Sequence, residues 1–108
     1  MNWKTLENES QLDTLFELSF AKPQLIFKHS TRCSISSVAK SRLDKTVINS
    51  IDSHYLDLIA HRNLSNLIAD KFGVHHESPQ VLLIKNGTCI YDETHSSINV
   101  DDLLDEIK

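Results

Sequence analysis

Strand-like and helix-like segments alternate along this chain, and that alternation most constrains how it can fold. Apolar, strand-like runs occupy 24–28, 54–59 and 80–85, and amphipathic segments separate them. Such an order predicts a central sheet with parallel pairs of strands and helices on both faces. Asn86-Gly87 then predicts a two-residue hairpin into a strand over 88–92, which adds an antiparallel pair. The sequence therefore predicts an α/β fold with a mixed sheet.

Four helices are predicted from apolar residues that recur at helical spacing. The first begins near Ser10 and ends before Pro23, after a short possible strand over 3–6. The second follows residue 33, the third is capped by Asn63 and ends at Gly73, and the fourth starts at Asn99. Their apolar faces are Leu12, Leu15, Phe16 and Phe20; Ile35, Val38, Ala39 and Leu43; Leu64, Leu67, Ile68 and Phe72; and Val100, Leu103, Leu104 and Ile107.

Length and charge exclude several classes of protein. The 108 residues suit one domain over 1–108, and the net charge of −4 argues against a nucleic-acid-binding protein. No apolar run is long enough to cross a bilayer, so no membrane partner is expected. The N-terminus lacks the apolar core of a signal peptide, which makes a cytoplasmic location the default expectation.

Cys33 is the strongest candidate for chemistry. It lies between the strand-like run 25–27 and a helix-like segment, with Ser36 three positions later in a C-x-x-S pattern. The start of a helix offers unpaired N–H groups and the positive end of its dipole, and both stabilise a thiolate. Lys28, His29 and Arg32 add local positive charge, which also favours a thiolate. We interpret the pattern as a thiol–disulfide exchange site with one cysteine, although a free cysteine can also be a small buried hydrophobe.

The other cysteine and the histidines carry weaker signals. Cys89 lies beside the predicted hairpin and is interpreted as an ordinary strand residue rather than a resolving thiol. Two cysteines make no disulfide framework, and the six histidines show no compact metal spacing. We expect no metal site and no tightly bound cofactor.

Three segments carry a resemblance to a known family. They are 25–33 (LIFKHSTRC), 74–80 (VHHESPQ) and 92–95 (DETH). Together they resemble the YtxJ-type monothiol bacilliredoxins, which have a thioredoxin-like fold and use the small thiol bacillithiol. The likeness extends from Trp3 to the last helix. One departure is Ser34, because the family usually has proline directly after the cysteine; Ser34 retains an N–H that proline lacks.

The resemblance implies a reaction. A protein thiol joined to bacillithiol is the substrate. Bacillithiol is the co-substrate, and either a second bacillithiol or a dedicated reductase later clears Cys33. The Cys33 thiolate attacks the bacillithiol sulfur and releases the protein thiol. The implied partners are bacillithiol and bacillithiolated client proteins.

The same resemblance implies the residues that surround the thiol. Pro79 is expected to be a cis proline that faces Cys33, and the backbone of Ser78 to pair with substrate. His95 is expected to contact bacillithiol or tune the thiolate, with a solvated loop histidine as the alternative. The predicted substrate-binding residues are Thr31, Arg32, Ser34, Ser36, Ser78, Pro79 and His95.

Two other functions stay open. A binding module would dock clients beside Pro79, and Cys33 would then be incidental. An iron–sulfur carrier like the monothiol glutaredoxins is less favoured, because the chain lacks their C-G-F-S motif.

Overall fold

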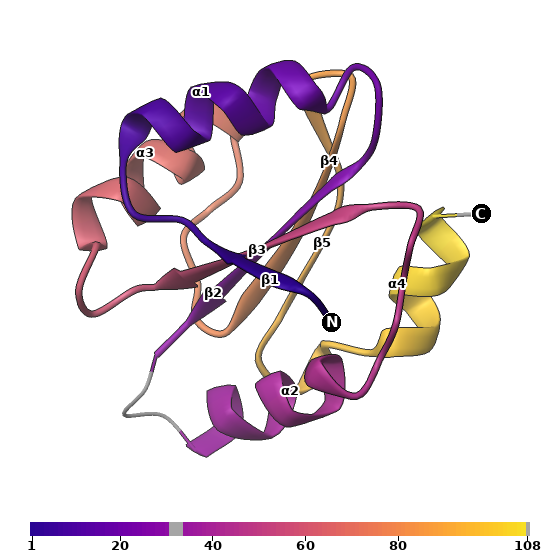
Figure 1. The fold of residues 1–108 in the computed structure, drawn as a ribbon. Coiled ribbons are helices and arrows are strands. Elements are labelled where there is room, and N and C mark those ends of the chain that lie inside the picture. Colours follow the sequence, from indigo (N-terminus) through magenta and orange to yellow (C-terminus); the bar gives the residue numbers. More distant parts are fainter. Residues whose placement is uncertain (31–33, 108) are drawn as a thin grey trace.

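A computed structural model of the chain describes residues 1–30 and 34–107 (Figure 1). Ten elements follow one another in it: β1 (Trp3–Thr5), α1 (Glu9–Leu18), β2 (Gln24–His29), α2 (Ser34–Asp44), β3 (Asp52–Asp57), α3 (Arg62–Phe72), β4 (Gln80–Lys85), β5 (Thr88–Thr94), the 3₁₀ turn η1 (His95–Ser97) and α4 (Val100–Ile107). None of the helices within these ranges combines the length and apolar character that crossing a bilayer requires.

The five strands form one mixed sheet in the order β1-β3-β2-β4-β5. β3 runs parallel to both β1 and β2, whereas β4 runs antiparallel to β2 and β5 antiparallel to β4. β2 is the central strand, and every one of its residues is buried. This order and these directions confirm the expected α/β architecture of the thioredoxin-like type, with a parallel half followed by a hairpin.

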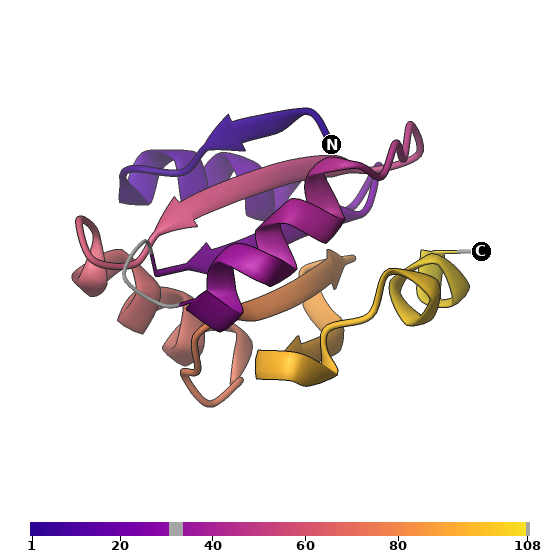
Figure 2. The same cartoon turned by 90° about the horizontal axis from the view of Figure 1, so that it is seen from below.

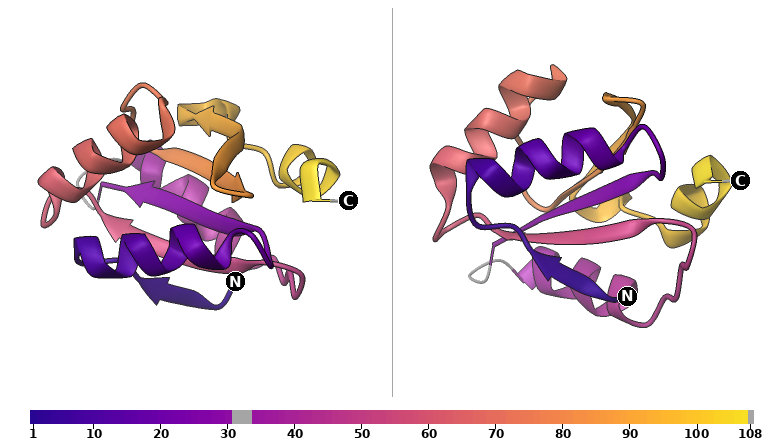
Figure 3. Two further views of the ribbon diagram at one scale, coloured as in Figure 1. Left: turned by 90° about the horizontal axis from the view of Figure 1, so that it is seen from above. Right: turned by 45° about the horizontal axis from the view of Figure 1, so that its top comes forward.

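Helices cover both faces of the sheet, so the structure has three layers. α1 and α3 lie on one face and α2 and α4 on the other (Figures 1 and 3). Alternate residues of β2 point to opposite faces: Ile26 joins the core beneath α1 and α3, whereas Leu25 and Phe27 join the core beneath α2 and α4. The central strand therefore serves two separate cores.

Two helices begin earlier than the sequence pattern predicts. Asn8, not Ser10, caps α1: its side chain accepts from the Gln11 N–H at 2.9 Å, and the Gln11 side chain accepts from the Asn8 N–H. This reciprocal pair is a capping box, which satisfies two otherwise unpaired donors. Asn63 lies inside α3, whose N-cap is His61, so its predicted capping role is wrong. Gly73 ends α3 in the left-handed conformation, as predicted.

Parts of three predicted apolar faces are not buried, and in α3 the exposed residue is Leu67. Ala39 and Leu43 bury α2 against the sheet, but Ile35 and Val38 are 46% and 52% exposed. Phe20 is also exposed, because α1 ends at Leu18 before reaching it. The predicted strand over 54–59 is shifted to Asp52–Asp57, since its pairing with β2 begins at Asp52.

The hairpin between β4 and β5 turns at Asn86 and Gly87, as predicted. Both residues have positive φ, 53° and 74°, which matches the twist of a two-residue hairpin. The backbone N–H groups of Asn86 and Gly87 donate to the carbonyl and the hydroxyl of Ser19, each at 2.9 Å. The end of α1 therefore holds the hairpin in place.

A lysine lies buried beneath α3. The Lys28 side chain is fully buried, and its ammonium donates to the Ser65 carbonyl at 3.1 Å and lies 3.4 Å from His76 Nδ1. The Ser65 hydroxyl is 2.9 Å from the same nitrogen. No carboxylate of the described chain lies within ion-pair distance of Lys28. Burial lowers its pKa from 10.5 to about 8, because a desolvated ammonium without a counter-ion is costly.

Replacing Gly87 tests the hairpin packing. A Cβ at this position would lie 2.8 Å from Phe16 Cε2 and 2.9 Å from Phe20 Cζ, at a φ that disfavours any side chain. We expect Gly87→Ala to lower the free energy of unfolding by about 2 kcal/mol or more in urea denaturation. Gly73→Ala is the matched control, because its φ is similarly positive but nothing lies within 4 Å; it should cost only about 1 kcal/mol. Equal losses would contradict the packing argument.

Replacing Lys28 tests the buried ammonium. Between pH 8 and 10.5 the unfolded chain holds the Lys28 proton more tightly than the folded chain does, so the free energy of unfolding should rise with pH. Lys28→Met removes this contribution. As the pH rises from 8 to 10.5, the free energy of unfolding of wild type should therefore increase relative to that of Lys28→Met. Urea denaturation at a series of pH values measures it.

Lys85→Met, at an exposed position of β4, is the matched control for that experiment and should leave the pH profile unchanged. If the free energy of unfolding depended on pH in the same way for wild type and Lys28→Met, the folded and unfolded states would bind the Lys28 proton equally tightly. That result would contradict the prediction.

Candidate functional site

The ends of three strands meet at one edge of the sheet. Lys28, near the end of β2, pairs with Gln80, the first residue of β4, and Gln80 pairs in turn with Thr94, the last residue of β5. The residues just beyond these strand ends therefore come together: Ser30 after β2, Pro79 before β4 and His95 after β5. α2 begins on the same side of the molecule (Figure 2). The antiparallel direction of β4 is what makes this convergence possible.

Three of the predicted site residues lie outside the described residues. They are Thr31, Arg32 and Cys33, which connect Ser30 to α2. Ser34 is the first residue of α2 and is exposed. Ser36 lies in the same first turn and is fully buried.

The buried Ser36 hydroxyl is bonded to the end of β2. Its Oγ lies 2.6 Å from His29 Nδ1 and accepts from the Ser30 backbone N–H at 3.1 Å. Ser36, the serine of the C-x-x-S pattern, is therefore hydrogen-bonded to the end of the strand that precedes the cysteine. Ser36 is in this way a fixed polar group at the start of α2.

The proline loop lies across the same edge. The Ser78–Pro79 peptide bond is cis, as predicted, and Pro79 is buried. The Ser78 hydroxyl is buried and has no hydrogen-bond partner in the described structure. The loop is fixed at its end by Gln80, whose side-chain amide donates to the His75 carbonyl at 3.0 Å.

His95 is held directly against this loop. Its backbone N–H donates to the Pro79 carbonyl at 2.9 Å, and its φ of 53° is unusual for a residue with a side chain. Its imidazole Nε2 lies 3.0 Å from a carboxylate oxygen of Glu77, also in the loop. The side chain is partly open to solvent, so it can contact a bound molecule as well as Glu77.

A narrow groove of about 170 Å³ separates α2 from η1. One wall is apolar and comes from the exposed side of α2; the other contains His95. Its lining comprises Ile35, Val38, Ala39, Arg42, His95, Ser96 and Ile98. The groove explains why Ile35 and Val38 are exposed: they line an opening instead of a core.

The expected cluster of positive charge is only partly present. Lys28 and His29 are neighbours in a strand, so they point to opposite faces of the sheet. Lys28 bonds to α3, whereas His29 stacks against Phe27 and Tyr55 beneath α2, with ring centroids 5.7 and 5.6 Å apart. Burial, and next the nearby Lys40 ammonium, lower the pKa of His29, while Asp57 and Asp44 oppose this shift. At pH 7 His29 is therefore mostly neutral and adds little positive charge.

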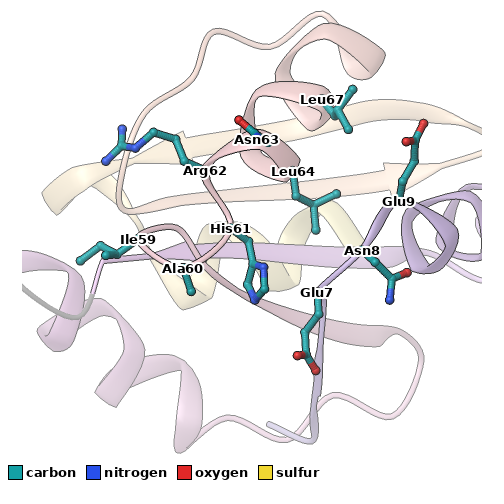
Figure 4. A pocket seen from close by; sticks show the side chains of 10 residues that line it. All are labelled: Glu7, Asn8, Glu9, Ile59, Ala60, His61, Arg62, Asn63, Leu64 and Leu67. Carbon is teal, nitrogen blue, oxygen red and sulfur yellow. The ribbon is translucent and has the colours of Figure 1, made fainter.

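A second pocket of about 410 Å³ lies between the starts of α1 and α3 (Figure 4). Glu7 and Asn8 face it from the segment before α1, and His61 and Leu64 face it from the N-cap and first turn of α3. No cysteine, serine or lysine lines this pocket, so it offers no thiol for disulfide exchange. Within 1–30 and 34–107, no three histidine, cysteine or acidic side chains converge as they would around a metal ion.

Cys89 lies on β5 and packs against the core beneath α1 and α3. Burial raises the pKa of its thiol to about 11. Its Sγ also donates to the Tyr91 carbonyl at 3.3 Å. A thiol in this state is almost entirely protonated at neutral pH, which agrees with its interpretation as an ordinary strand residue.

Two contacts were not predicted from the sequence. One is the bond between His29 and Ser36, and the other is the bond between His95 and Glu77. Strand alternation was a usable signal for the first, because it places His29 on the same face as Leu25 and Phe27. No local signal pointed to the second, since it depends on how β5 ends beside the proline loop.

Comparison with known proteins agrees with this geometry. The family model for the monothiol bacilliredoxin BrxC matches residues 4–103. A solved thioredoxin-fold protein, described as a candidate oxidoreductase, is 32% identical, with a TM-score of 0.87 over 98% of this chain and 94% of that one.

More distant structures share the fold alone. The thioredoxin of Fasciola hepatica is 15% identical, with a TM-score of 0.75 over 96% of this chain and 95% of that one. Mitochondrial thioredoxin 3 of Saccharomyces cerevisiae is 16% identical, with a TM-score of 0.77 over 96% and 92%. Because the family match spans nearly the whole sequence, this chain belongs to the monothiol bacilliredoxins, a family of oxidoreductases with the thioredoxin fold.

Proposed function

We propose that this protein removes bacillithiol from mixed disulfides on client proteins, with Cys33 as the nucleophile. The observation that carries the proposal is the meeting of the start of α2, the cis-proline loop and His95 at one edge of the sheet. Ser34 begins α2, so Cys33 immediately precedes this helix in the sequence. Both the unpaired N–H groups and the dipole of that end favour a thiolate.

The proposed reaction is a single exchange of disulfides. The Cys33 thiolate attacks the bacillithiol sulfur of the mixed disulfide, and a new S–S bond forms as the old one breaks. The electron pair leaves on the client sulfur, which takes a proton from water. A second bacillithiol, as its thiolate, then attacks the bacillithiol sulfur held on Cys33, frees Cys33 and departs as oxidised bacillithiol. No tightly bound cofactor or metal takes part.

The residues around the thiol have proposed roles in holding the substrate. The backbone of Ser78, the residue before Pro79, forms hydrogen bonds with the client or with bacillithiol. His95, fixed beside that loop, contacts the bacillithiol half. Thr31, Arg32, Ser34 and Ser36 complete the proposed binding site, with Arg32 pairing with a carboxylate of bacillithiol. A cytoplasmic location belongs to the same proposal, because the reaction needs free thiols.

A non-catalytic binding module is the second candidate. The exposed side chains of Ile35 and Val38 along the groove favour it, since apolar side chains in a groove can dock a protein. In that case the client would bind regardless of whether Cys33 is present.

Transfer of bacillithiol between two proteins tests the proposal. A protein with one cysteine is converted to its bacillithiol mixed disulfide, mixed with this protein, and followed by intact mass. We expect bacillithiol to leave the first protein and to appear on Cys33, and Cys33→Ser to abolish the transfer. Cys89→Ser is the matched control and should keep the rate within about twofold, because a thiol with a pKa of about 11 holds almost no thiolate.

Failure of wild type to accept bacillithiol would contradict the enzymatic role. Binding of the modified protein that is equal in wild type and Cys33→Ser would then support the binding module.

A further inference from the structure

The buried ammonium of Lys28 lies where α3 meets the loop over 74–79, which ends at Pro79. Lys28 is the second-last residue of β2, and its side chain is fully buried. Its Nζ donates to the Ser65 carbonyl of α3 at 3.1 Å and lies 3.4 Å from Nδ1 of His76 in the loop. One ammonium therefore contacts both the helix and the loop that follows it.

The direction of the hydrogen bond to His76 follows from the groups that face its Nδ1. A lysine ammonium has hydrogens to donate and no lone pair with which to accept. The Ser65 hydroxyl, which is also fully buried, lies 2.9 Å from the same nitrogen. A hydrogen on Nδ1 would face the Lys28 ammonium, so Nδ1 is bare and accepts. The neutral ring carries its hydrogen on Nε2.

The surroundings of His76 keep its ring neutral. Burial, and next the Lys28 ammonium, lower the pKa of His76. Arg62 of α3 and the neighbouring His75 act in the same direction, whereas Glu77 opposes the shift. A protonated ring would have no lone pair on Nδ1, so only the neutral form can accept from Lys28.

The contact at His76 is one of three consecutive anchors of this loop. On either side of it, the Gln80 side chain donates to the carbonyl of the preceding residue at 3.0 Å, and the His95 imidazole lies 3.0 Å from the carboxylate of the following one. The His95 contact is exposed to solvent, whereas Lys28 is buried. A charged donor that water does not reach makes a strong hydrogen bond.

Packing alone does not explain a lysine at this place. Among the residues that the structure describes, no carboxylate forms an ion pair with the Lys28 ammonium. A buried charge without a counter-ion costs free energy, and an apolar side chain of similar length would avoid that cost. What the ammonium adds is the pair of contacts to Ser65 and His76.

We propose that Lys28 is a positioning residue that fixes, through His76, the loop that presents Pro79 to a client protein. This inference rests on the proposed function, because it takes the backbone of Ser78 as the place where the client binds. His76 lies two residues before Ser78, so a displaced His76 ring also displaces the backbone that the client would contact. Loss of the ammonium should therefore weaken selection of the client and leave the reactivity of the thiol unchanged.

Nitrogen-15 NMR of the histidines tests the contact itself. The chemical shifts of Nδ1 and Nε2 distinguish the two neutral tautomers, and we expect His76 to carry its hydrogen on Nε2 near pH 7. In Lys28→Met the titration midpoint of His76 should rise, because a nearby positive charge is gone. A hydrogen on Nδ1 in wild type would overturn the proposal, and that result depends neither on a variant nor on bacillithiol chemistry.

Two rate constants separate positioning of the client from thiol chemistry. One is for transfer of bacillithiol from a modified protein with one cysteine, and the other is for alkylation of Cys33 by iodoacetamide, which is too small to need the loop. In Lys28→Met we expect the first to fall about tenfold and the second to stay within about twofold. Lys85→Met, at an exposed position of β4, is the matched control and should preserve both.

The same assays test whether Lys28 acts through His76. His76→Phe has no acceptor at the place of Nδ1 and should lower the transfer rate as much as Lys28→Met does. Combining the two substitutions should cause no further loss beyond about twofold, because both remove one contact. His76→Asn, whose amide oxygen can occupy the place of Nδ1, should retain more of the transfer rate than His76→Phe.

Three kinetic results would overturn the inference. They are an unchanged transfer rate in Lys28→Met, equal losses of transfer and alkylation, and losses that multiply in the double variant. Equal losses would indicate a general distortion of the fold instead of a displaced loop. Failure of wild type to accept bacillithiol is a different outcome, because it would overturn the proposed function and with it the client-binding role of the loop.

Discussion

The burial of β2 is the constraint on which the rest of the structure depends. This strand pairs with β3 on one side and with β4 on the other, so it is hydrogen-bonded to a neighbouring strand along both sides. Its side chains supply both cores, with Ile26 on one face and Leu25 and Phe27 on the other. A strand buried on both faces fixes its register, because a shift of one residue would exchange the two sets of side chains.

Both polar residues of β2 near its end are explained by this burial. Lys28 and His29 cannot reach bulk water from a central strand, so each must find partners within the protein. Lys28 finds them on α3 and at His76, and His29 finds Ser36 on α2. The two helices that flank the site are thereby connected to the same strand from opposite faces. Burial therefore requires both polar groups of β2 to form hydrogen bonds with neighbouring parts of the protein.

Strong local signals made much of the fold predictable from the sequence. β4 has the predicted bounds because its apolar run is followed by Asn86-Gly87, whose backbone preferences are local. The start of α1 was misplaced because Ser10 and Asn8 are both good caps, and only the side chain of Gln11 decides between them. Ile35 and Val38 were assigned to the core because helical spacing identifies an apolar stripe but does not show which part of it another element covers.

The candidate site was predictable to the extent that it follows from strand order. The placement of Pro79 and His95 at one edge follows from a hairpin that returns beside β2. The sequence predicted the hairpin, and the family resemblance implied the place of Pro79. Strand alternation indicates which face His29 occupies, but not its contact with Ser36, because that contact depends on two side-chain rotamers and on the distance between the end of β2 and the first turn of α2.

The antiparallel pairing of β4 with β2 also affects the order in which the site can be assembled during synthesis. A ribosome makes Cys33 in the first third of the chain, whereas Pro79 and His95 emerge only near its end. The convergence of the start of α2, the proline loop and His95 is therefore complete only after the hairpin has joined the sheet.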